Sequence, residues 1–189
     1  MTTSRINRRQ LIIECAAELF MEHGYSATSV RQIADEVGVT EAALYYHFKS
    51  GKRELLEAVF GFYMPDFARI LDHCGEVTSL AELIRCFGSQ VEKLGRESME
   101  RFRWIISEFP HLSDDEKELF YKRHLELQNA LTSGVQEFVD DPEQARHIAL
   151  TVICTMIGYG MLFWNLGMDK VTGFGVEHII NTVSAWIED

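Results

Sequence analysis

Apolar residues at helical spacing, with few interruptions, are the feature that most constrains the fold of this chain. In the first stretch Ile12, Ala16, Leu19 and Phe20 recur at the spacing of one helix face. Only three prolines occur in 189 residues, so long stretches lack the residue that ends or kinks a helix. Val and Thr seldom alternate as a strand requires. The sequence therefore predicts an all-α fold.

Glycine and threonine positions divide the N-terminal region into three short helices. A first helix over residues 7–23 is followed by a glycine, as a left-handed cap would end it. Thr28 or Ser29 can cap a second helix, which closes after about ten residues. The tripeptide Gly38-Val39-Thr40 then forms a sharp turn into a third helix over residues 41–47. The pattern predicts two short helices at a steep angle.

A long helix is expected to begin near Lys52 and to end or kink at Pro65, and it joins two modules. Pro142 sits where a first-turn proline belongs. The apolar periodicity predicts about nine helices in the whole chain. The remaining amphipathic stretches are Leu80–Leu94, Arg101–Phe109, Asp114–Val139, Pro142–Leu166 and Val176–Ile187.

The formal net charge of −11 argues at first against nucleic acid, because phosphates are neutralised by Lys and Arg. Its distribution changes this interpretation. Residues 1–60 hold seven basic and eight acidic groups, whereas residues 61–189 hold 11 and 21. Basic residues collect at the extreme N-terminus and around 49–53. A local basic surface is therefore compatible with the acidic total.

The four cysteines, Cys15, Cys74, Cys86 and Cys154, are scattered and form no C-x-x-C pair. Neither a structural zinc nor a disulfide framework is suggested, and we expect reduced, mostly buried thiols. The first residues lack a long apolar run before a cleavage site, so a cytoplasmic location is expected.

The segment from Ile148 to Met168 holds 21 residues without a formal charge, enough in principle to span a bilayer. The alternative is a fully buried helix. Polar residues interrupt the segment and no basic loop flanks it, so we expect the buried helix and no membrane partner.

The third predicted helix has an outward face suited to DNA. Such a face must meet base edges and phosphates, so it carries hydrogen-bonding groups and few bulky aliphatics. The alternative interpretation of Tyr45 is that it packs in the core. At the start of the second helix, Thr28 can contact a phosphate, and its alternative role, capping the helix, is compatible with that contact. The residues concerned are Thr40, Glu41, Ala42, Tyr45, Tyr46 and His47.

These residues, in this order, resemble the tetracycline-repressor (TetR) family. The resemblance covers roughly residues 7–60 and rests on the run from Gly24 to Ala34, on Gly38-Val39-Thr40 and on Leu44-Tyr45-Tyr46-His47-Phe48. It implies a helix-turn-helix DNA-binding domain over residues 1–52 and a ligand-binding and dimerisation domain over residues 53–189. It also implies a homodimer, whose last two helices usually form a four-helix interface.

The resemblance implies the DNA contacts as well. The loop over residues 49–52 is one residue longer than the commonest family form, so either lysine could reach a phosphate. Glu41 could accept a hydrogen bond from a cytosine amine or simply repel the DNA. Residues expected at bases or their edges are Arg31, Thr40, Glu41, Ala42 and Tyr46, and residues expected at the backbone are Thr28, Tyr45, His47, Lys49 and Lys52.

The C-terminal part holds many large apolar residues, and core packing explains most of them. A cavity for an apolar ligand needs the same lining with a few polar groups. By resemblance we expect a hydrophobic or aromatic effector there. Gly158, Gly160 and the last helix could let helices approach closely across a two-fold axis or pack within one chain. The candidate lining residues are Phe67, Phe102, Trp104, Phe120, His124, Gln128, Thr155, Tyr159 and Phe163.

The competing class is a helical metal-dependent enzyme, which needs two Glu-x-x-His motifs and two further glutamates. Only Glu108-Phe109-Pro110-His111 fits, and its proline would break the helix. No catalytic triad, phosphate loop or dinucleotide fingerprint occurs. We therefore expect no enzyme, cofactor or metal site, but a dimeric repressor that binds a palindromic operator in double-stranded DNA and is released by its effector. The alternatives are an activator or a constitutive DNA-binding protein.

Overall fold

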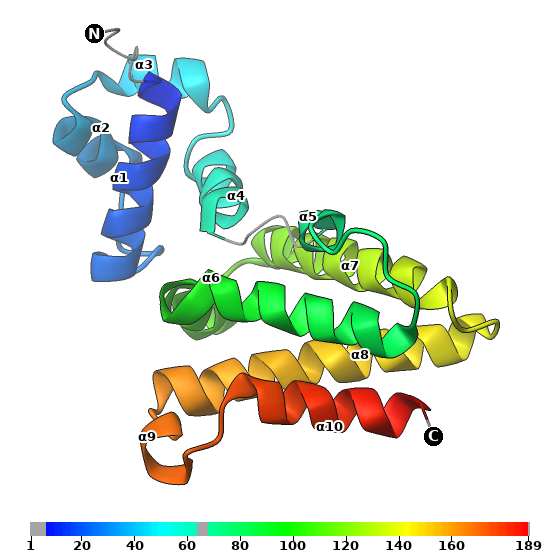
Figure 1. The fold of residues 1–189 in the computed structure, drawn as a ribbon. Helices are drawn as coiled ribbons and strands as arrows, with labels where there is room; N and C mark the ends of the chain where they lie inside the picture. Colours follow the sequence, from blue (N-terminus) through cyan, green and yellow to red (C-terminus); the bar gives the residue numbers. More distant parts are fainter. Residues whose placement is uncertain (1–6, 64–67, 189) are drawn as a thin grey trace, which may run out of the picture. The chain divides into compact units, whose positions relative to one another are not determined.

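The computed structural model describes residues 7–63 and 68–188, and every regular element in these ranges is a helix (Figure 1). The prediction of an all-α fold with an N-terminal helix-turn-helix is confirmed. The chain divides into two compact units, which are described separately below. The first unit comprises residues 1–64 and 104–120, and the second comprises residues 65–103 and 121–189.

Local capping sets the first three helices of the first unit. Helix α1 (Arg8–His23) begins after Asn7, whose side chain accepts a hydrogen bond from the Arg9 amide at 3.1 Å. Helix α2 (Val30–Val37) is capped by Ser29 in a reciprocal capping box and ends at Gly38 in the left-handed region, with φ of 73°. Helix α3 (Glu41–His47) begins after Thr40, whose hydroxyl accepts from the Ala43 amide at 3.1 Å. These boundaries match the predicted ones.

The core of the first unit is built from the apolar stripes that the sequence shows. Helix α4 (Lys52–Tyr63) packs its apolar face against α1 and completes this core. The side chains that are almost fully removed from solvent are Ile12, Ala16, Phe20, Ile33, Leu44, Phe48, Leu55, Leu56 and Val59.

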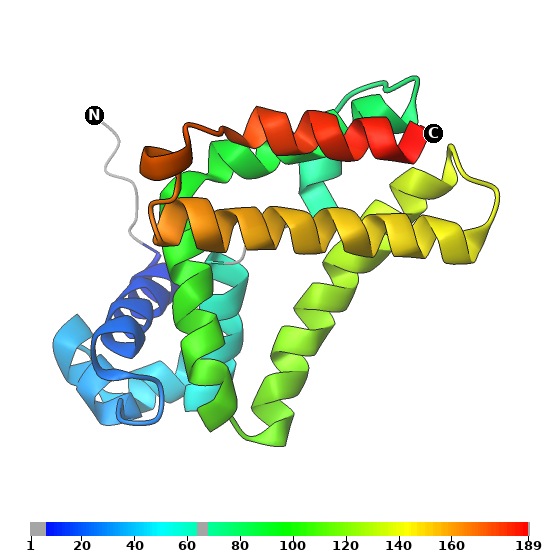
Figure 2. The same ribbon diagram turned by 90° about the horizontal axis from the view of Figure 1, so that it is seen from below.

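Two long helices belong to both units. Helix α6 (Leu80–Glu108) and helix α7 (Asp114–Gln136) are joined by a short 3-10 turn, η1 (Phe109–His111), and Figure 2 shows them meeting at this turn. Their adjoining ends, residues 104–120, pack in the first unit. The boundary expected between residues 52 and 53, which separates a DNA-binding domain from a ligand-binding and dimerisation domain, stays a prediction.

The second unit holds the remaining helices. They are α5 (Ala68–Asp72), α8 (Pro142–Tyr159), α9 (Asp169–Thr172) and α10 (Val176–Glu188). Helix α8 continues into a π-helical segment, η2 (Gly160–Asn165), and α8 and α10 lie side by side in both ribbon views (Figures 1 and 2). The core includes Leu83, Ile84, Phe87, Leu127, Leu131, Val135, Val152, Ile153, Met156, Ile180 and Val183.

Two expectations about the helices were incomplete. Helix α6 is one helix of 29 residues, where the apolar pattern predicts two stretches. The polar residues between those stretches, such as Arg96 and Glu97, are good helix formers and do not interrupt the backbone. The short helices α5 and α9 were not predicted, because five and four residues are too few to show a period.

The expectation of reduced, mostly buried thiols was wrong for three of the four cysteines. Cys74 and Cys86 form a disulfide, with 5.6 Å between their Cα atoms and 12 residues between them in sequence. Cys154 is exposed, and only Cys15 is a partly buried thiol. The loop after α5 folds back onto the start of α6, and this tertiary arrangement brings the two sulfurs together.

The uncharged segment forms one helix, and the expectation that it is fully buried was wrong for the single chain. Within the described residues, Pro142–Asn165 is long and apolar enough to cross a membrane, but core helices of soluble proteins pass the same test. Only 33% of its most apolar window is buried inside the chain. The other part of the helix therefore presents a surface that the chain itself does not cover.

Candidate DNA-binding interface

Helix α3 presents a polar and aromatic face to solvent. Leu44 is fully buried and fixes the inner side of the helix, whereas the Tyr46 side chain is 80% exposed and Tyr45 is 46% exposed. Thr40, Glu41 and Ala42 are also exposed. The helix thus carries hydrogen-bonding groups outward and one leucine inward, as contact with a DNA groove requires.

Tyr45 is neither a core residue nor free on the surface. Its ring lies against the loop between α3 and α4, where a Cβ atom added to Gly51 would approach the Tyr45 Cε1 atom to 3.0 Å. Gly51 also has a φ of 62°, in the left-handed region that favours glycine. Glu54 fixes the loop further, because its carboxylate accepts from the Ser50 amide at 3.0 Å. The loop therefore holds the Tyr45 ring in place.

Three other candidates lie on α3, in the loop after it and on α2. The His47 ring meets the Tyr46 ring edge-on, with 5.3 Å between centroids. Lys49 is exposed in the loop. Arg31 on α2 is exposed and lies 3.8 Å from the Asp35 carboxylate, an exposed ion pair that contributes little to stability. The Arg31 guanidinium is thus available to another acceptor.

Thr28 does not present its side chain to solvent, and its expected phosphate contact is not supported. The residue is only 2% exposed, and its hydroxyl donates to the Gly24 carbonyl at 2.9 Å and contacts the Leu19 carbonyl at 3.2 Å. The helix cap itself is Ser29. Thr28 therefore closes the turn between α1 and α2.

Lys52 is half-buried, and its ammonium group is bonded within its own unit. Its Nζ atom donates to the Ser26 carbonyl at 3.2 Å and lies 4.3 Å from the centroid of the Tyr25 ring. Burial lowers the pKa of Lys52, although the Glu116 and Glu108 carboxylates oppose the shift. Of the two lysines left open by the sequence, Lys49 is the one that faces solvent.

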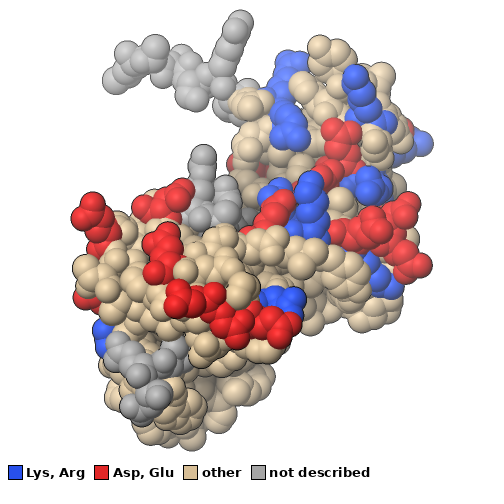
Figure 3. All heavy atoms as spheres, turned by 90° about the vertical axis from the view of Figure 1, so that its right-hand side faces the viewer, with Lys and Arg blue, Asp and Glu red and all other residues tan. Residues whose placement is uncertain are grey.

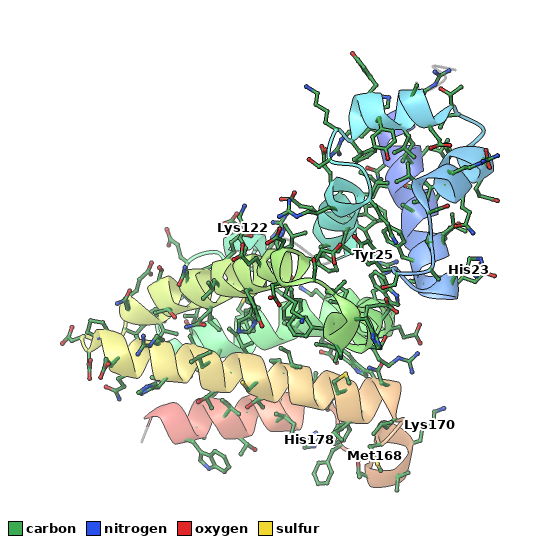
Figure 4. All side chains as sticks on the ribbon, turned by 180° about the vertical axis from the view of Figure 1, so that it is seen from behind. His23, Tyr25, Lys122, Met168, Lys170 and His178 are labelled. Carbon is green, nitrogen blue, oxygen red and sulfur yellow. A yellow bond between two sulfur atoms is a disulfide. The ribbon has the colours of Figure 1, made fainter. Side chains whose placement is uncertain are left out.

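A group of residues that sequence reasoning missed surrounds Tyr25, labelled in Figure 4. The Tyr25 amide donates to the Glu108 carboxylate at 3.0 Å, and its hydroxyl donates to Glu116 in a short hydrogen bond. The Trp104 indole Nε1 donates to the Phe20 carbonyl at 3.0 Å. These partners lie 83 to 91 residues apart in sequence, so no local pattern could reveal them.

Two pKa shifts accompany these contacts. Burial raises the pKa of Tyr25 most, and the hydrogen bond to Glu116 adds to the shift. For Glu116, burial alone would raise the pKa. Hydrogen bonds from Tyr25 and Ser113 outweigh burial, so the pKa of Glu116 is lowered. The pair thus holds its proton on the phenol.

The residues expected to line an effector cavity fall in both units. Trp104 and Phe120 belong to the first unit, where Trp104 stacks on Phe20 and Phe120 meets Phe109 edge-on at 5.2 Å. Phe67 and the Phe102 side chain lie outside the described residues.

The other candidates for the effector cavity belong to the second unit. His124 and Gln128 are half-buried on α7, and Thr155 binds the Thr151 carbonyl at 2.7 Å. Tyr159 and Phe163 are stacked at 4.6 Å.

The surface of α8 and α10 holds small and apolar exposed residues. Nothing lies within 4 Å of a Cβ atom added to Gly158, and Trp186 on α10 is 74% exposed. Ile180 and Val183 on α10 pack in the core of their own unit.

Acidic and basic side chains are unevenly spread over the surface. On the face shown in Figure 3, most Lys and Arg side chains lie in the upper part with Asp and Glu side chains among them, and a row of Asp and Glu side chains crosses the lower part. Within the described residues, no group of three His, Cys, Asp or Glu side chains could hold a metal ion. Glu108, from the Glu-x-x-His match, binds the Tyr25 amide instead.

Comparison with known proteins identifies the N-terminal pattern. Residues 12–59 match the family model described as "Bacterial regulatory proteins, tetR family". The chain is 27% identical over 189 residues to the uncharacterized HTH-type transcriptional regulator YerO of Bacillus subtilis (strain 168), covering 93% of this chain and 64% of that protein. It is 42% identical over 66 residues to the HTH-type transcriptional repressor KstR2 of Mycobacterium tuberculosis (strain ATCC 25618 / H37Rv). This match covers 35% of this chain and 33% of that protein.

The chain thus spans less than two thirds of the length of these relatives. Among solved structures, a TetR transcriptional regulator from Legionella pneumophila is similar with a TM-score of 0.69 and 24% identity. The similarity covers 96% of this chain and 98% of that one, and it shows the shared fold.

Proposed function

Because this chain belongs to the tetR family of bacterial regulatory proteins, we propose that it is a cytoplasmic transcriptional repressor. It binds a palindromic operator as a homodimer and leaves it when a small hydrophobic or aromatic effector binds. The observation that carries the proposal is the outward face of α3, where exposed Tyr45 and Tyr46 stand beside buried Leu44.

The exposed residues divide into two roles on DNA. Tyr45 and Lys49 lie at the loop end of α3, and a phenol and an ammonium there contact phosphates at any sequence. Arg31, Glu41 and Tyr46 are exposed on α2 and α3 and face base edges. The first group sets affinity and the second sets sequence preference.

The dimer is supported by an uncovered face on two neighbouring helices. Four residues of α8 and of the π-helical segment η2 share one side at helical spacing and stay open or partly open: Thr151, Cys154, Gly158 and Leu162. The Thr151 hydroxyl is bonded to the carbonyl one turn earlier, at 2.8 Å, so it needs no other acceptor. Small residues permit close packing of helices across a two-fold axis.

Exposed apolar side chains of the second unit support the same interface. A monomer that exposes this much apolar surface in its last 30 residues would be prone to association. The side chains are Leu162, Leu166, Val171, Phe174 and Trp186.

The effector site is proposed for the second unit, where polar groups lie among apolar ones. His124, Gln128 and Thr132 share one side of α7 at four-residue spacing. The Thr132 hydroxyl and the Asn165 carbonyl oxygen are buried without a hydrogen-bond partner. Buried polar atoms usually have a partner, so these atoms are suited to a ligand that donates or accepts hydrogen bonds.

Selection from random DNA duplexes tests the proposal. The protein should enrich a sequence with two inverted half-sites, because the two recognition helices of a dimer enter major grooves about 34–36 Å apart. A variant with Tyr45→Ala and Tyr46→Ala keeps Leu44 buried and should enrich nothing. No enrichment by the unchanged protein, or a consensus without two-fold symmetry, contradicts the proposal. A constitutive DNA-binding protein would instead give the palindrome but no response across a broad library of apolar compounds.

A further inference from the structure

Three side chains from the ends of α6 and α7 hold one short turn of the three-helix module α1–α3. They are Trp104, Glu108 and Glu116, and with Tyr25 we call them the Tyr25 clamp. All four residues belong to the first unit. Each long-range contact reaches the segment from Phe20 to Tyr25, where α1 ends and the chain turns toward α2.

The contacts of the clamp are of three independent kinds. Glu108 accepts from the Tyr25 amide, and Glu116 accepts from the Tyr25 hydroxyl. Trp104 donates to the Phe20 carbonyl and stacks on the Phe20 ring, with 6.4 Å between centroids. Hydrogen bonds to a carboxylate are stronger than neutral ones, and three contacts on one turn fix both its position and its direction.

The turn itself does not need these contacts in order to close. Gly24 supplies a positive φ of 86°, and the Gly24 amide binds the Phe20 carbonyl at 3.0 Å. The buried Thr28 hydroxyl completes the turn from within, through the Gly24 carbonyl. The clamp therefore adds something other than local closure: it fixes the module to the last turn of α6 and the first turn of α7.

Both clamp helices continue without a break into the core of the second unit. Leu83, Ile84 and Phe87 of α6 and Leu127 and Leu131 of α7 are buried there. The side chains that hold the module are therefore carried by the same two helices that supply part of the core of the second unit.

We propose that Tyr25, Glu108 and Glu116 are positioning residues that set the orientation of the three-helix module on the ends of α6 and α7. They thereby set the half-site spacing that the dimer accepts. This inference rests on the proposed function, because spacing has a meaning only for a dimer on a two-part operator. The clamp residues touch no DNA, and they act through the direction in which α3 is presented.

Hydrogen exchange of the full-length protein without DNA tests the contacts directly. Glu108→Ala and Glu116→Ala should speed exchange of the amides of residues 24–28 by about tenfold or more, since local opening becomes easier. Glu116→Gln keeps a carbonyl that accepts from the Tyr25 hydroxyl and should exchange nearly as the unchanged protein does. Asp141→Ala, which removes the N-cap of α8, serves as a destabilised control outside the clamp. Unchanged exchange in both alanine variants overturns the proposal.

Operator affinity then separates positioning from mere stability. Each protein is titrated with the selected operator and with the same operator lengthened by one base pair between its half-sites. Glu108→Ala, Glu116→Ala and Tyr25→Phe should reduce the penalty for the inserted base pair by about fivefold or more, the lower end of typical coupling between sites. Asp141→Ala and Glu116→Gln should leave this penalty unchanged. If the clamp variants weaken binding to both operators by one common factor, the clamp only stabilises the fold and the proposal is wrong.

A failure of the proposed function is distinguishable from these results. If the unchanged protein selects no two-part operator, the proposed function fails. The clamp is then judged by exchange alone, where faster exchange in Glu116→Ala with rescue by Glu116→Gln supports it.

Discussion

The Tyr25 hydroxyl donates a hydrogen bond to the carboxylate of Glu116, a residue 91 positions further along the chain. The hydrogen bond joins the turn after α1 to the first turn of α7, within the same compact unit. The helix-turn-helix is therefore attached to two helices that lie far from it in the sequence.

The pH dependence of stability should report the Glu116 contact. The pKa of Glu116 is lowered in the folded protein from an ordinary value of 4.5, so its contribution is present above that value and is lost as the pH falls through the folded pKa. Urea unfolding at pH 5, 4 and 3 should show a steeper loss of stability for the unchanged protein than for Glu116→Gln. The neighbouring charged groups, Lys52, Arg53 and Glu108, are the same in both proteins. Parallel pH profiles would contradict the expected contribution.

Gly51→Ala should lower stability by about 1–2 kcal/mol from backbone strain, and more from contact with the Tyr45 ring. Gly75→Ala is a matched control, because Gly75 has a φ of 63° but nothing within 4 Å of the added Cβ atom. Only Gly51→Ala should also weaken operator binding, since it displaces Tyr45. Denaturant unfolding and operator titration measure the two effects. Equal losses of stability and unchanged operator binding in both variants would show that the contact with Tyr45 is unimportant.

The two classes of DNA residue should respond differently to substitution. Lys49→Ala and Tyr45→Phe should weaken binding to all sequences, and Lys49→Ala should reduce the salt dependence by about one phosphate contact. Arg31→Ala should change the preferred base at particular positions by about 1–3 kcal/mol. Repeating the duplex selection with each variant measures the change in preference. A uniform loss of affinity for Arg31→Ala would place it among the backbone contacts.

Substitution of Glu41 distinguishes two interpretations of its carboxylate, as an acceptor from a base or as a group that repels DNA. If its carboxylate accepts from a cytosine amine, Glu41→Gln should change the preferred base at one position in each half-site. If it repels phosphates, the same variant should bind every sequence more tightly without a change in preference. The selected consensus and the affinity for unrelated DNA decide between them.

Trp186→Glu should convert the dimer to a monomer, because the exposed indole lies on the uncovered face of α10. Leu125→Glu is the matched control, since Leu125 on α7 is also a large exposed apolar residue. Sedimentation at micromolar concentration should give a monomer only for Trp186→Glu. A dimer in both variants would exclude the proposed interface.

Removing the Cys74–Cys86 disulfide should lower stability by about 3 kcal/mol, the loop-closure entropy of a loop this short. Cys74→Ser with Cys86→Ser should unfold at lower denaturant, and reduction of the unchanged protein should have the same effect. Cys154→Ser removes an exposed thiol and serves as the control, because it should leave the stability almost unchanged. An effect of Cys154→Ser as large as that of the double variant would contradict this assignment.

Sequence reasoning succeeded where structure is local. The sequence predicted the cap at Thr40, a cap at Thr28 or Ser29 and the end of the second helix at Gly38, because each depends on residues within one turn of the helix. The left-handed cap expected at Gly24 was wrong, since Gly24 has a positive φ of 86° but a ψ of 147°. Thr28 and Lys52 have the sequence positions of phosphate ligands. In the fold, however, Thr28 is buried and the Lys52 ammonium donates to the Ser26 carbonyl. Periodicity does not predict these contacts, because they are made with residues of other elements.

Contacts across long sequence separations were beyond the sequence. The disulfide needs the loop after α5 to return to α6, and the Tyr25 contacts need the ends of α6 and α7 to meet α1. The expected effector residues divide between two units for the same reason. Apolar character predicts burial but not which residues are buried together.

The uninterrupted length of α6 has a mechanical consequence. At a rise of about 1.5 Å per residue its 29 residues form a lever arm of about 43 Å. A rotation of about 3° at the buried end displaces the other end by about 2 Å, and Glu108 stands at that end. Under the proposed function, an effector would therefore not need to reshape its surroundings in order to disturb operator binding, because a small tilt of one helix is enough to break the hydrogen bond between Glu108 and the Tyr25 amide.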